Sequence, residues 1–461
     1  MDRREFLKRS ALLSAALATS DIAQASDILQ PYSGHPEGKN QDAAEEALPH
    51  EEAGKGLLAS APMLQNYAET SIGIAFAVSD LANGYVIYGR RPDLSDGTRV
   101  MCGGFRTTEL SDRVVQVRLT GLKPSTAYYY RIGADRIRYK GGYDIKVTGN
   151  EEDPHIYRFT TAGSNSRAHF CVINDTHAKW EVIDRTMEKI ALLAPSCVVW
   201  NGDASNVEET IEAQTRIFFT PEIARRDYAA QTPYLFCPGN HDLRGMANRH
   251  LERVWMYRQP DERPSRDWDL GRNFALRMGE VAMIGLDTGE DKLDTNPKFA
   301  GTFNSQAYRE AQTTWLRDVL RRPDIAKAPY LVAFCHIPLF DPDPKRNPGD
   351  VAPADTAPQY DTDYAMWQRT CAHLWGPLLE KAHCQLVITA HQHSYRYDAP
   401  TATRPWAQIV GGGPNLKLSR QGEFPTVIEG EVQGGRFQVT VHNLLSGQVQ
   451  QVMTFDRRRK K

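Results

Sequence analysis

Five short motifs, spread over more than two hundred residues, carry side chains that can bind metal ions. They are Asp175-Thr176-His177, Gly202-Asp203, Gly239-Asn240-His241-Asp242, Cys335-His336 and His391-Gln392-His393. Each follows an apolar run with the composition of a buried strand. Carboxylate, imidazole and amide ligands suit Mn, Fe and Zn better than Cu(I) or a thiolate cluster. Two such ions held about 3.5–4 Å apart can clamp the attacking and leaving oxygens of an in-line displacement.

Taken singly, most of these residues have a simpler explanation. A lone histidine such as His177 or His336 is more often a core or surface residue than a ligand, and Asp203 alone could cap a helix. His391 and His393 are a stronger pair, because alternate residues of a strand point to the same face. Only the five motifs together predict a centre with two metal ions.

The elements that must position these motifs alternate between strands and helices from residue 167 onward. We predict strands at 169–173, 197–200, 234–237, 281–286, 331–334 and 385–389, and helices at 180–193, 207–219, 305–322 and 366–382. The alternation predicts an α/β domain over residues 167–455 with largely buried strands. The motifs lie just past the carboxyl ends of these strands, where α/β sheets commonly place their sites. Residues 341–363, rich in Pro and Asp, are expected to form a long loop.

Residues 66–162 have the composition of an all-β domain. Strands are expected at 72–78, 85–88, 114–119 and 157–161, and Asn83-Gly84 is a hairpin-turn signal. The segment from Leu119 to Tyr130 resembles the corner before strand F of fibronectin type III domains, with Tyr128 as the tyrosine-corner residue. A different β-sandwich is the alternative. Such a domain is expected to pack and present rather than to catalyse.

The first 25 residues look like an export signal. Arg3-Arg4 precedes an apolar stretch, 11–18, and Ala23-Gln24-Ala25 is a small-residue cleavage site. The paired arginines resemble a twin-arginine signal, with a Sec signal or a short cytosolic helix as alternatives. Residues 26–65 are polar and are expected to form a mobile leader or a strap on another domain. We therefore expect a periplasmic or secreted protein.

Charge and cysteine content narrow the expected partners. The net charge of −2 gives no basic track for nucleic acid, and no stretch apart from the signal approaches a membrane span. The seven cysteines are odd in number and show no disulfide framework. We expect the five that lie in or beside strand-like runs to be buried free thiols, namely Cys171, Cys197, Cys237, Cys335 and Cys384.

The order and spacing of the five motifs resemble the calcineurin-like metallophosphoesterase superfamily over roughly residues 167–400. With the β domain ahead of it, the layout also resembles purple acid phosphatases. The resemblance implies a four-layer α/β/β/α sandwich and a pair of divalent or trivalent metal ions, such as Mn, Fe or Zn. It implies that one ion is bound by Asp175, His177 and His393, that the other is bound by Asn240, His336 and His391, and that Asp203 bridges them.

The resemblance also implies catalytic roles for His241 and Asp242. His241 would contact the phosphoryl group, and Asp242 would hold the far nitrogen of its ring. A hydroxide held by the metals would attack phosphorus in line, with His241 stabilising charge or protonating the leaving oxygen. The implied substrate is a small phosphate ester. A phosphomonoester is favoured, a phosphodiesterase or nucleotidase is the alternative, and a non-catalytic metal-containing binding protein is the third reading.

The sequence departs from the purple acid phosphatase pattern at the first ion. Asn206 stands where those enzymes have a Tyr, and His177 is offered instead, so a purple tyrosinate–iron centre is not expected. Asn174 and Ala390 occupy positions that usually hold Gly in the superfamily, and we expect a local backbone adjustment there. Asp287 is expected to be structural rather than a ligand.

Overall fold

The computed structural model describes residues 56–101, 110–219, 227–257, 268–299, 301–342, 362–417 and 422–458. The predicted signal at 1–25, most of the 26–65 leader and most of the 341–363 loop lie outside these ranges. No helix within the described ranges is both long and apolar enough to cross a bilayer.

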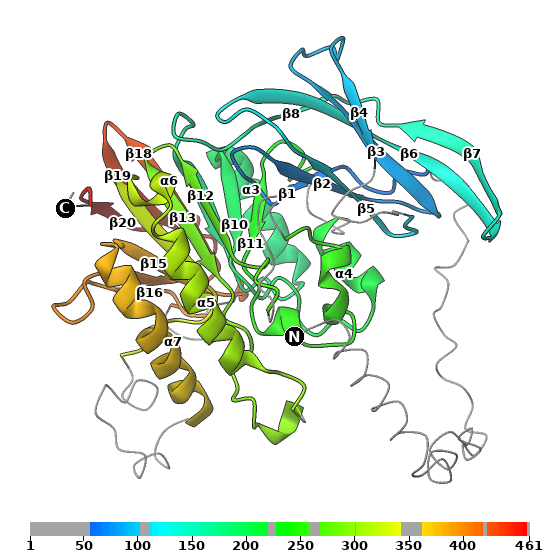
Figure 1. Cartoon of the computed structure of the whole chain (residues 1–461). Coiled ribbons are helices and arrows are strands. Elements are labelled where there is room, and N and C mark those ends of the chain that lie inside the picture. The colour runs from blue at the N-terminus through cyan, green and yellow to red at the C-terminus, as the bar shows by residue number, and fades with distance from the viewer. Residues whose placement is uncertain are drawn as a thin grey trace, which may run out of the picture. The chain divides into compact units, whose positions relative to one another are not determined.

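Two large sheets form the centre of the described chain (Figure 1). The first has nine strands in the order β20-β19-β18-β9-β10-β11-β1-β2-β5, and the second has six in the order β12-β13-β14-β15-β17-β16. Six strands of the first sheet follow residue 163: β9 (His169–Ile173), β10 (Cys197–Trp200), β11 (Tyr234–Phe236), β18 (Thr426–Gln433), β19 (Arg436–Asn443) and β20 (Val449–Phe455). The second contains β12 (Phe274–Met278), β13 (Val281–Leu286), β14 (Tyr330–Cys335), β15 (Leu386–Thr389), β16 (Arg396–Asp398) and β17 (Ala407–Val410).

Helices cover the outer face of each sheet. On the nine-stranded sheet, residues of α3 (Trp180–Leu193) and α4 (Ile211–Phe218) share one apolar cluster with β9, β10 and β11. On the six-stranded sheet, α5 (Ser305–Val319), α6 (Pro323–Ala326) and α7 (Thr362–Lys381) share another with β13, β14 and β15. A third cluster fills the space between the sheets. The predicted four-layer α/β/β/α sandwich is therefore confirmed.

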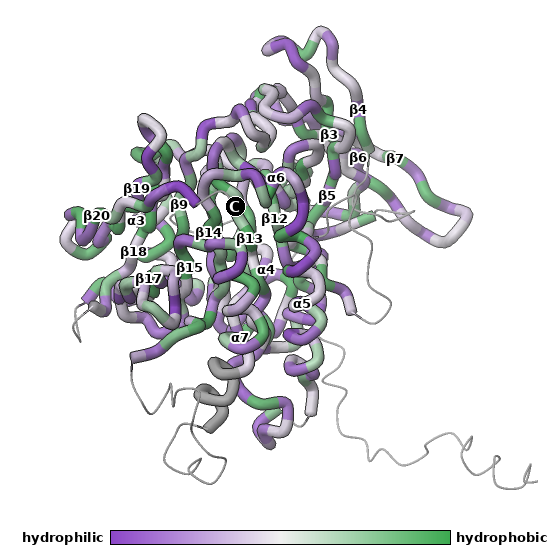
Figure 2. The backbone as a smooth tube through the Cα atoms, turned by 60° about the vertical axis from the view of Figure 1, so that its left-hand side comes forward, coloured by the Kyte–Doolittle hydropathy of each residue, from purple (hydrophilic) through white to green (hydrophobic). Residues whose placement is uncertain are grey.

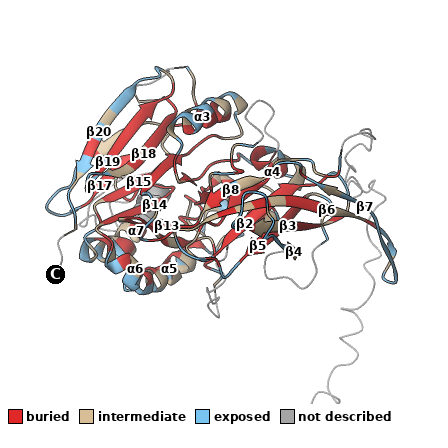
Figure 3. Cartoon of the chain, turned by 90° about the horizontal axis from the view of Figure 1, so that it is seen from above, coloured by how far each residue is buried: buried red, intermediate tan, exposed pale blue. Residues whose placement is uncertain are grey.

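Burial and hydropathy follow this layering. The strands of both central sheets are largely buried in Figure 3. The helices α5 and α7 carry both hydrophilic and hydrophobic residues in Figure 2, as expected of helices with one face on a sheet and one in water. The predicted helix over 305–322 ends at Val319, because Arg322 adopts an extended conformation before Pro323. The helix predicted from 207 begins at Ile211, where the Thr210 hydroxyl accepts a hydrogen bond from the Ala213 N–H.

The strands ahead of residue 163 form what we call the β unit. One part, β1 (Met63–Gln65), β2 (Ile72–Ala77) and β5 (Val114–Leu119), extends the nine-stranded sheet, because β1 pairs in parallel with β11. The other is a five-stranded sheet of β3 (Ala82–Gly89), β4 (Thr98–Met101), β6 (Ala127–Gly141), β7 (Asp144–Glu152) and β8 (Tyr157–Thr160). Residues 63–65, expected to belong to the leader, are thus a strand of the central sheet.

Two details of the β unit bear on its sequence interpretation. The Asn83-Gly84 hairpin prediction is wrong, because both residues lie inside β3 and pair with β6. A Cβ on Gly84 would lie 2.1 Å from a Val115 methyl group, so the glycine permits close packing of the two sheets. The Tyr128 hydroxyl accepts a hydrogen bond from the Lys123 N–H at 2.9 Å, as a tyrosine corner would. The fibronectin type III assignment itself stays a prediction.

The cysteines of the described residues are free thiols, and all six are buried: Cys171, Cys197, Cys237, Cys335, Cys371 and Cys384. Burial raises the pKa of each thiol, which keeps these groups protonated and unreactive. The five predicted to be buried are among them.

Candidate metal centre

The motif residues converge where strands of the two sheets end. Asp175 and His177 follow β9, Asp203 follows β10, and His336 follows β14. Asn240 follows β11 through a short segment, and His391 and His393 follow β15. Five of these residues have a left-handed backbone, with φ between 46° and 69°: Asp175, His177, Asp203, His391 and His393. Such conformations are uncommon outside glycine and gather at functional sites, where the surrounding structure enforces them.

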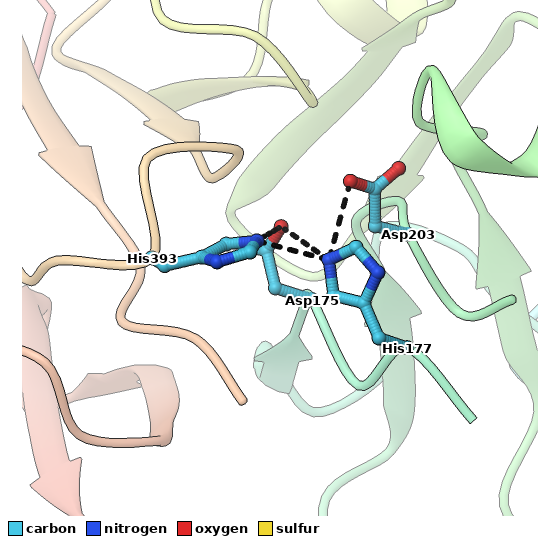
Figure 4. A group of neighbouring side chains, drawn as sticks. All are labelled: Asp175, His177, Asp203 and His393. Atoms are coloured by element: carbon cyan, nitrogen blue, oxygen red, sulfur yellow. Dashed lines mark hydrogen bonds and ion pairs between the residues drawn. The ribbon is translucent and has the colours of Figure 1, made fainter. Parts of the chain in front are cut away.

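The first group of ligand atoms belongs to Asp175, His177, Asp203 and His393, and these atoms all lie within 4.8 Å of one another (Figure 4). His177 Nε2 is 2.9 Å from His393 Nε2 and 3.5 Å from Asp203 Oδ2. His393 Nε2 is 3.6 Å from Asp175 Oδ1. Two imidazole nitrogens and two carboxylates therefore face one point.

The second group belongs to Asp203, His336 and His391. His336 Nε2 is 3.1 Å from Asp203 Oδ2, and His391 Nδ1 is 3.0 Å from Asn240 Oδ1. Asn240 therefore lies beside this group, as its sequence motif predicts. Asp203 belongs to both groups, so one carboxylate lies between two sets of ligands.

Glycines make this convergence sterically possible. A Cβ on Gly202 would lie 2.2 Å from His336 Nδ1, and one on Gly239 would lie 2.2 Å from Asp203 Oδ1. Gly202 also has a φ of 83°, which favours glycine. The glycines of the Gly-Asp and Gly-Asn motifs thus leave room for the ligands of the other motifs.

The electrostatics of the centre fit bound cations. Asp175 Oδ1 is buried and makes no hydrogen bond within the described residues, which is costly unless another group satisfies it. Burial raises the pKa of Asp175 to about 7. Burial lowers the pKa of His177 to about 4 and that of His391 to about 3, so both rings are neutral and can coordinate a metal. For His336, burial acts downward, but Asp203 outweighs it and raises the pKa to about 10.

The expected contact between Asp242 and the His241 ring is not made. The Asp242 carboxylate accepts hydrogen bonds from the Asp203 N–H at 2.7 Å, from the Gly239 N–H at 2.8 Å, and from the N–H and hydroxyl of Ser205. It therefore fixes the loop that carries Asp203. His241 Nδ1 instead lies 3.1 Å from the backbone carbonyl oxygen of Asn206, which holds the ring. The prediction was wrong because residue spacing does not reveal backbone carbonyls.

Three residues beside the centre were missed in the sequence. Arg244 lies with a guanidinium nitrogen 3.3 Å from His241 Nε2, and it donates hydrogen bonds to Glu290 and to Asp291. Asp291 Oδ2 lies 3.6 Å from His391 Nε2, the nitrogen opposite the one that faces Asn240. Arg244 follows His241 by three residues, and the acidic pair follows the end of β13. That position past a strand end was the only available signal.

The departures from the family pattern are accommodated locally. Asn174 donates hydrogen bonds to Asp175 Oδ2 at 2.7 Å and to the Gly412 carbonyl at 3.0 Å, so its side chain braces the first ligand. Asp287 accepts from the Gly289 N–H and from the Tyr308 hydroxyl, which is the structural role expected for it.

Comparisons with known proteins agree with this arrangement. Residues 168–395 match the calcineurin-like phosphoesterase family model. The structure is similar to that of the purple acid phosphatase PPD1 from seeds of yellow lupin (Lupinus luteus), with a TM-score of 0.58 and 14% identity, over 87% of this chain and 75% of that one. It is also similar to PhoD, with a TM-score of 0.56 and 11% identity, over 86% and 88% of the two chains. At these identities the likeness is one of fold. Curated protein sequences give no match.

Proposed function

Because residues 168–395 form a calcineurin-like phosphoesterase domain, which makes the chain a hydrolase of phosphoric esters, we propose that it is an exported phosphomonoesterase with two metal ions. Asp175, His177 and His393 would hold one ion, and Asn240, His336 and His391 would hold the other. Asp203 would be shared by both. The observation that carries this assignment is the place of the Asp203 carboxylate in both groups of ligand atoms.

The metals, when bound, would lower the pKa of water and neutralise charge on the phosphoryl group. Hydrolysis forms a P–O bond to the water oxygen and breaks the P–O bond to the leaving group, whose oxygen gains a proton. Asn206 holds His241 Nδ1 through its carbonyl, so the Nε2 atom is directed away from that loop. Arg244 places a positive charge beside Nε2. Arg244 stabilises negative charge on the transferring group, and His241, whose Nε2 accepts from the guanidinium, positions Arg244.

The preference for monoesters is tested against the phosphodiesterase alternative. The purple acid phosphatase fold likeness favours monoesters. A cavity of about 1330 Å³ next to Arg244 has room for a large organic group on the phosphate, which a diester or a nucleotide monoester would carry. Mature protein loaded separately with Mn, Fe, Zn or Co would be assayed on p-nitrophenyl phosphate and on bis-p-nitrophenyl phosphate. A higher kcat/KM for the monoester is expected, and a higher value for the diester would overturn the monoesterase assignment.

Export is the second part of the proposal. It is supported by Arg3-Arg4, by the apolar stretch 11–18 and by the Ala23-Gln24-Ala25 cleavage site, all outside the described residues. The six buried thiols suit a route that carries folded proteins, because none is exposed to mispairing after export. Replacing Arg3-Arg4 with Lys-Lys should retain the precursor in the cytoplasm. Unchanged export of that variant would point to a Sec signal.

A further inference from the structure

A large cavity is lined by Arg244, the residue that contacts His241 beside the metal centre. Its volume is about 1330 Å³. Three wall segments lead directly from the centre: Val207 follows the loop of Asp203, Leu243 and Arg244 follow His241, and Gly289 precedes the acidic pair at the end of β13. Arg244 belongs to both places, because it lines the cavity and contacts His241 Nε2.

Aromatic rings form much of the cavity wall. Trp268 and Tyr308 pack with ring centroids 5.8 Å apart, and Phe299 and Phe303 meet edge to face at 5.2 Å. All four side chains are only partly buried, so ring surface remains available inside the cavity. Paired aromatic side chains of this kind offer a face on which a planar ring can stack.

Arginines line the same cavity. Arg244 is paired with Glu290 and Asp291, and Arg272 lies 3.8 Å from Asp287. Arg118, which is buried, lines the cavity as well. Arg249 differs from these three. It is exposed, its Nε faces His250 Nε2 at 3.0 Å, and no carboxylate of the described residues lies within ion-pair distance of it. Its guanidinium can therefore receive an anionic group, for which Arg is well suited.

Carboxylates on the wall are mostly committed elsewhere. Asp287 accepts hydrogen bonds from Gly289 and Tyr308, and Glu209 accepts one from the Met246 N–H. Asp269 accepts a hydrogen bond from the Gly271 N–H, and Glu252 is the fourth acidic residue of the wall. The cavity thus combines ring surfaces with an arginine that is free of acidic partners.

We propose that this cavity receives the leaving group of the phosphate ester and selects one that joins an aromatic ring to a second anionic group, as a nucleotide does. The inference rests on the proposed hydrolytic function and adds a substrate class to it. The ring stacks on the aromatic wall, and the second anionic group pairs with Arg249. Arg244 lies between the cavity and the reacting phosphoryl group.

The first test compares three monoesters with the metal-loaded, full-length mature enzyme. Adenosine 3′,5′-bisphosphate has a ring and a second phosphate, adenosine 5′-monophosphate has the ring alone, and glycerol 3-phosphate has neither. Arg249→Gln should lower kcat/KM for the bisphosphate by roughly tenfold, as expected for a lost hydrogen bond to a charged group, and leave glycerol 3-phosphate unchanged. Phe303→Leu should lower kcat/KM for both adenosine substrates. Arg253→Gln, exposed on the same segment but outside the cavity wall, is the matched control.

An equal loss for all three substrates, or no loss in either cavity variant, would overturn the inference. Equilibrium dialysis of adenosine 3′,5′-bisphosphate separates this failure from a failure of the proposed function. If no ester is hydrolysed with any metal, the hydrolytic proposal fails. The cavity is then judged by binding alone: binding that is weakened by Arg249→Gln supports it, and absence of binding rejects it.

Discussion

The strand-end loops of the metal centre and the β unit differ in how particular buried polar side chains find hydrogen-bond partners. In the β unit, the Tyr128 hydroxyl accepts from the Lys123 N–H, and the Tyr130 hydroxyl donates to the Ala230 carbonyl at 2.5 Å. In the centre, Asp175 Oδ1 is buried without a hydrogen-bond partner in the described residues. These two hydroxyls of the β unit therefore have partners within the protein, whereas Asp175 Oδ1 would gain one only from a bound cation.

Backbone conformation shows the same contrast. In the β unit, the non-glycine residues with positive φ are Asn66, Leu94 and Ser125, which lie between strands. In the centre, five of the seven proposed ligands are left-handed, at a cost of roughly 1–3 kcal/mol each. The ligands are thus held in backbone conformations that their residue types disfavour. We therefore expect that removing a polar group from the centre can raise the free energy of unfolding of the metal-free protein, whereas removing one from the β unit should lower it.

The largest effect is expected from Asp203→Asn, which weakens both halves of the centre. Turnover should fall by more than about 100-fold, since even mutation of an outer partner of a metal ligand costs 10–100-fold. The measurement is kcat together with metal content by mass spectrometry. His241→Ala is the matched control, and it should lose rate while keeping both ions. A variant at Asp203 with normal rate and two ions would contradict the dinuclear centre.

A smaller, one-sided effect is expected from Asp291→Asn. Its carboxylate lies 3.6 Å from His391 Nε2, so the substitution should weaken binding of the second ion by roughly 10–100-fold and spare the first. Competition with a fluorescent chelator measures both affinities. Glu290→Gln serves as the control, because Glu290 contacts Arg244 without an ion pair to His391. Equal loss at both ions would show that Asp291 acts on the whole site.

Asp175→Asn should reverse sign between activity and stability. The substitution removes a proposed metal ligand and should therefore abolish activity. It should nevertheless stabilise the metal-free protein by roughly 1–3 kcal/mol, the cost of a buried group left unpaired. The raised pKa of Asp175, about 7, means that the folded state binds more protons than the unfolded state between about pH 4 and 7. The contribution of Asp175 to stability therefore falls as pH rises through this window.

Urea unfolding of the chelator-treated proteins at pH 4, 5, 6 and 7 measures this effect. The difference in unfolding free energy between Asp175→Asn and the parent should grow with pH. Parallel curves would mean that the Asp175 carboxylate is compensated in the metal-free protein, which would remove the contrast with the β unit.

The smallest effect is expected in the β unit. Tyr128→Phe leaves the Lys123 N–H without its partner and should cost about 1 kcal/mol of unfolding free energy, with kcat unchanged. Tyr129→Phe is the matched control, because its hydroxyl makes no hydrogen bond in the described part of the chain. A loss of activity in Tyr128→Phe at full metal content would show that the corner influences the centre.

The elements that were predicted correctly have a clear apolar pattern within their own sequence. The strand at 197–200 and the helix at 180–193 have the predicted bounds, because strong apolar periodicity marked them. The ligands could be predicted because each follows such a strand. The strand at 63–65 could not, since three residues carry little pattern, and Gly84 was misread because its role depends on Val115 in the opposite sheet.

The parts that were missed depend on contacts between distant segments. Arg244 and Asp291 meet only after β11 and β13 have been placed in different sheets. The carbonyl of Asn206 orients His241 without any sequence signature, because every residue has a carbonyl. The sequence motifs thus identified the proposed metal ligands, whereas the residues that surround and orient those ligands are brought there only by the tertiary structure.

The strand order affects folding of the chain during its synthesis on the ribosome. Strand β9, which carries the first ligands, lies between β10 and β18, and β18 begins only at Thr426. Strand β1, near the other end of the described chain, pairs with β11. The nine-stranded sheet therefore cannot be completed until the chain has been synthesised through β20. A chain released before β18 is made would leave the edge of β9 unpaired and would lack part of the support for the loop that carries Asp175 and His177. Completion of the sheet and formation of the metal site therefore depend on the same late strand.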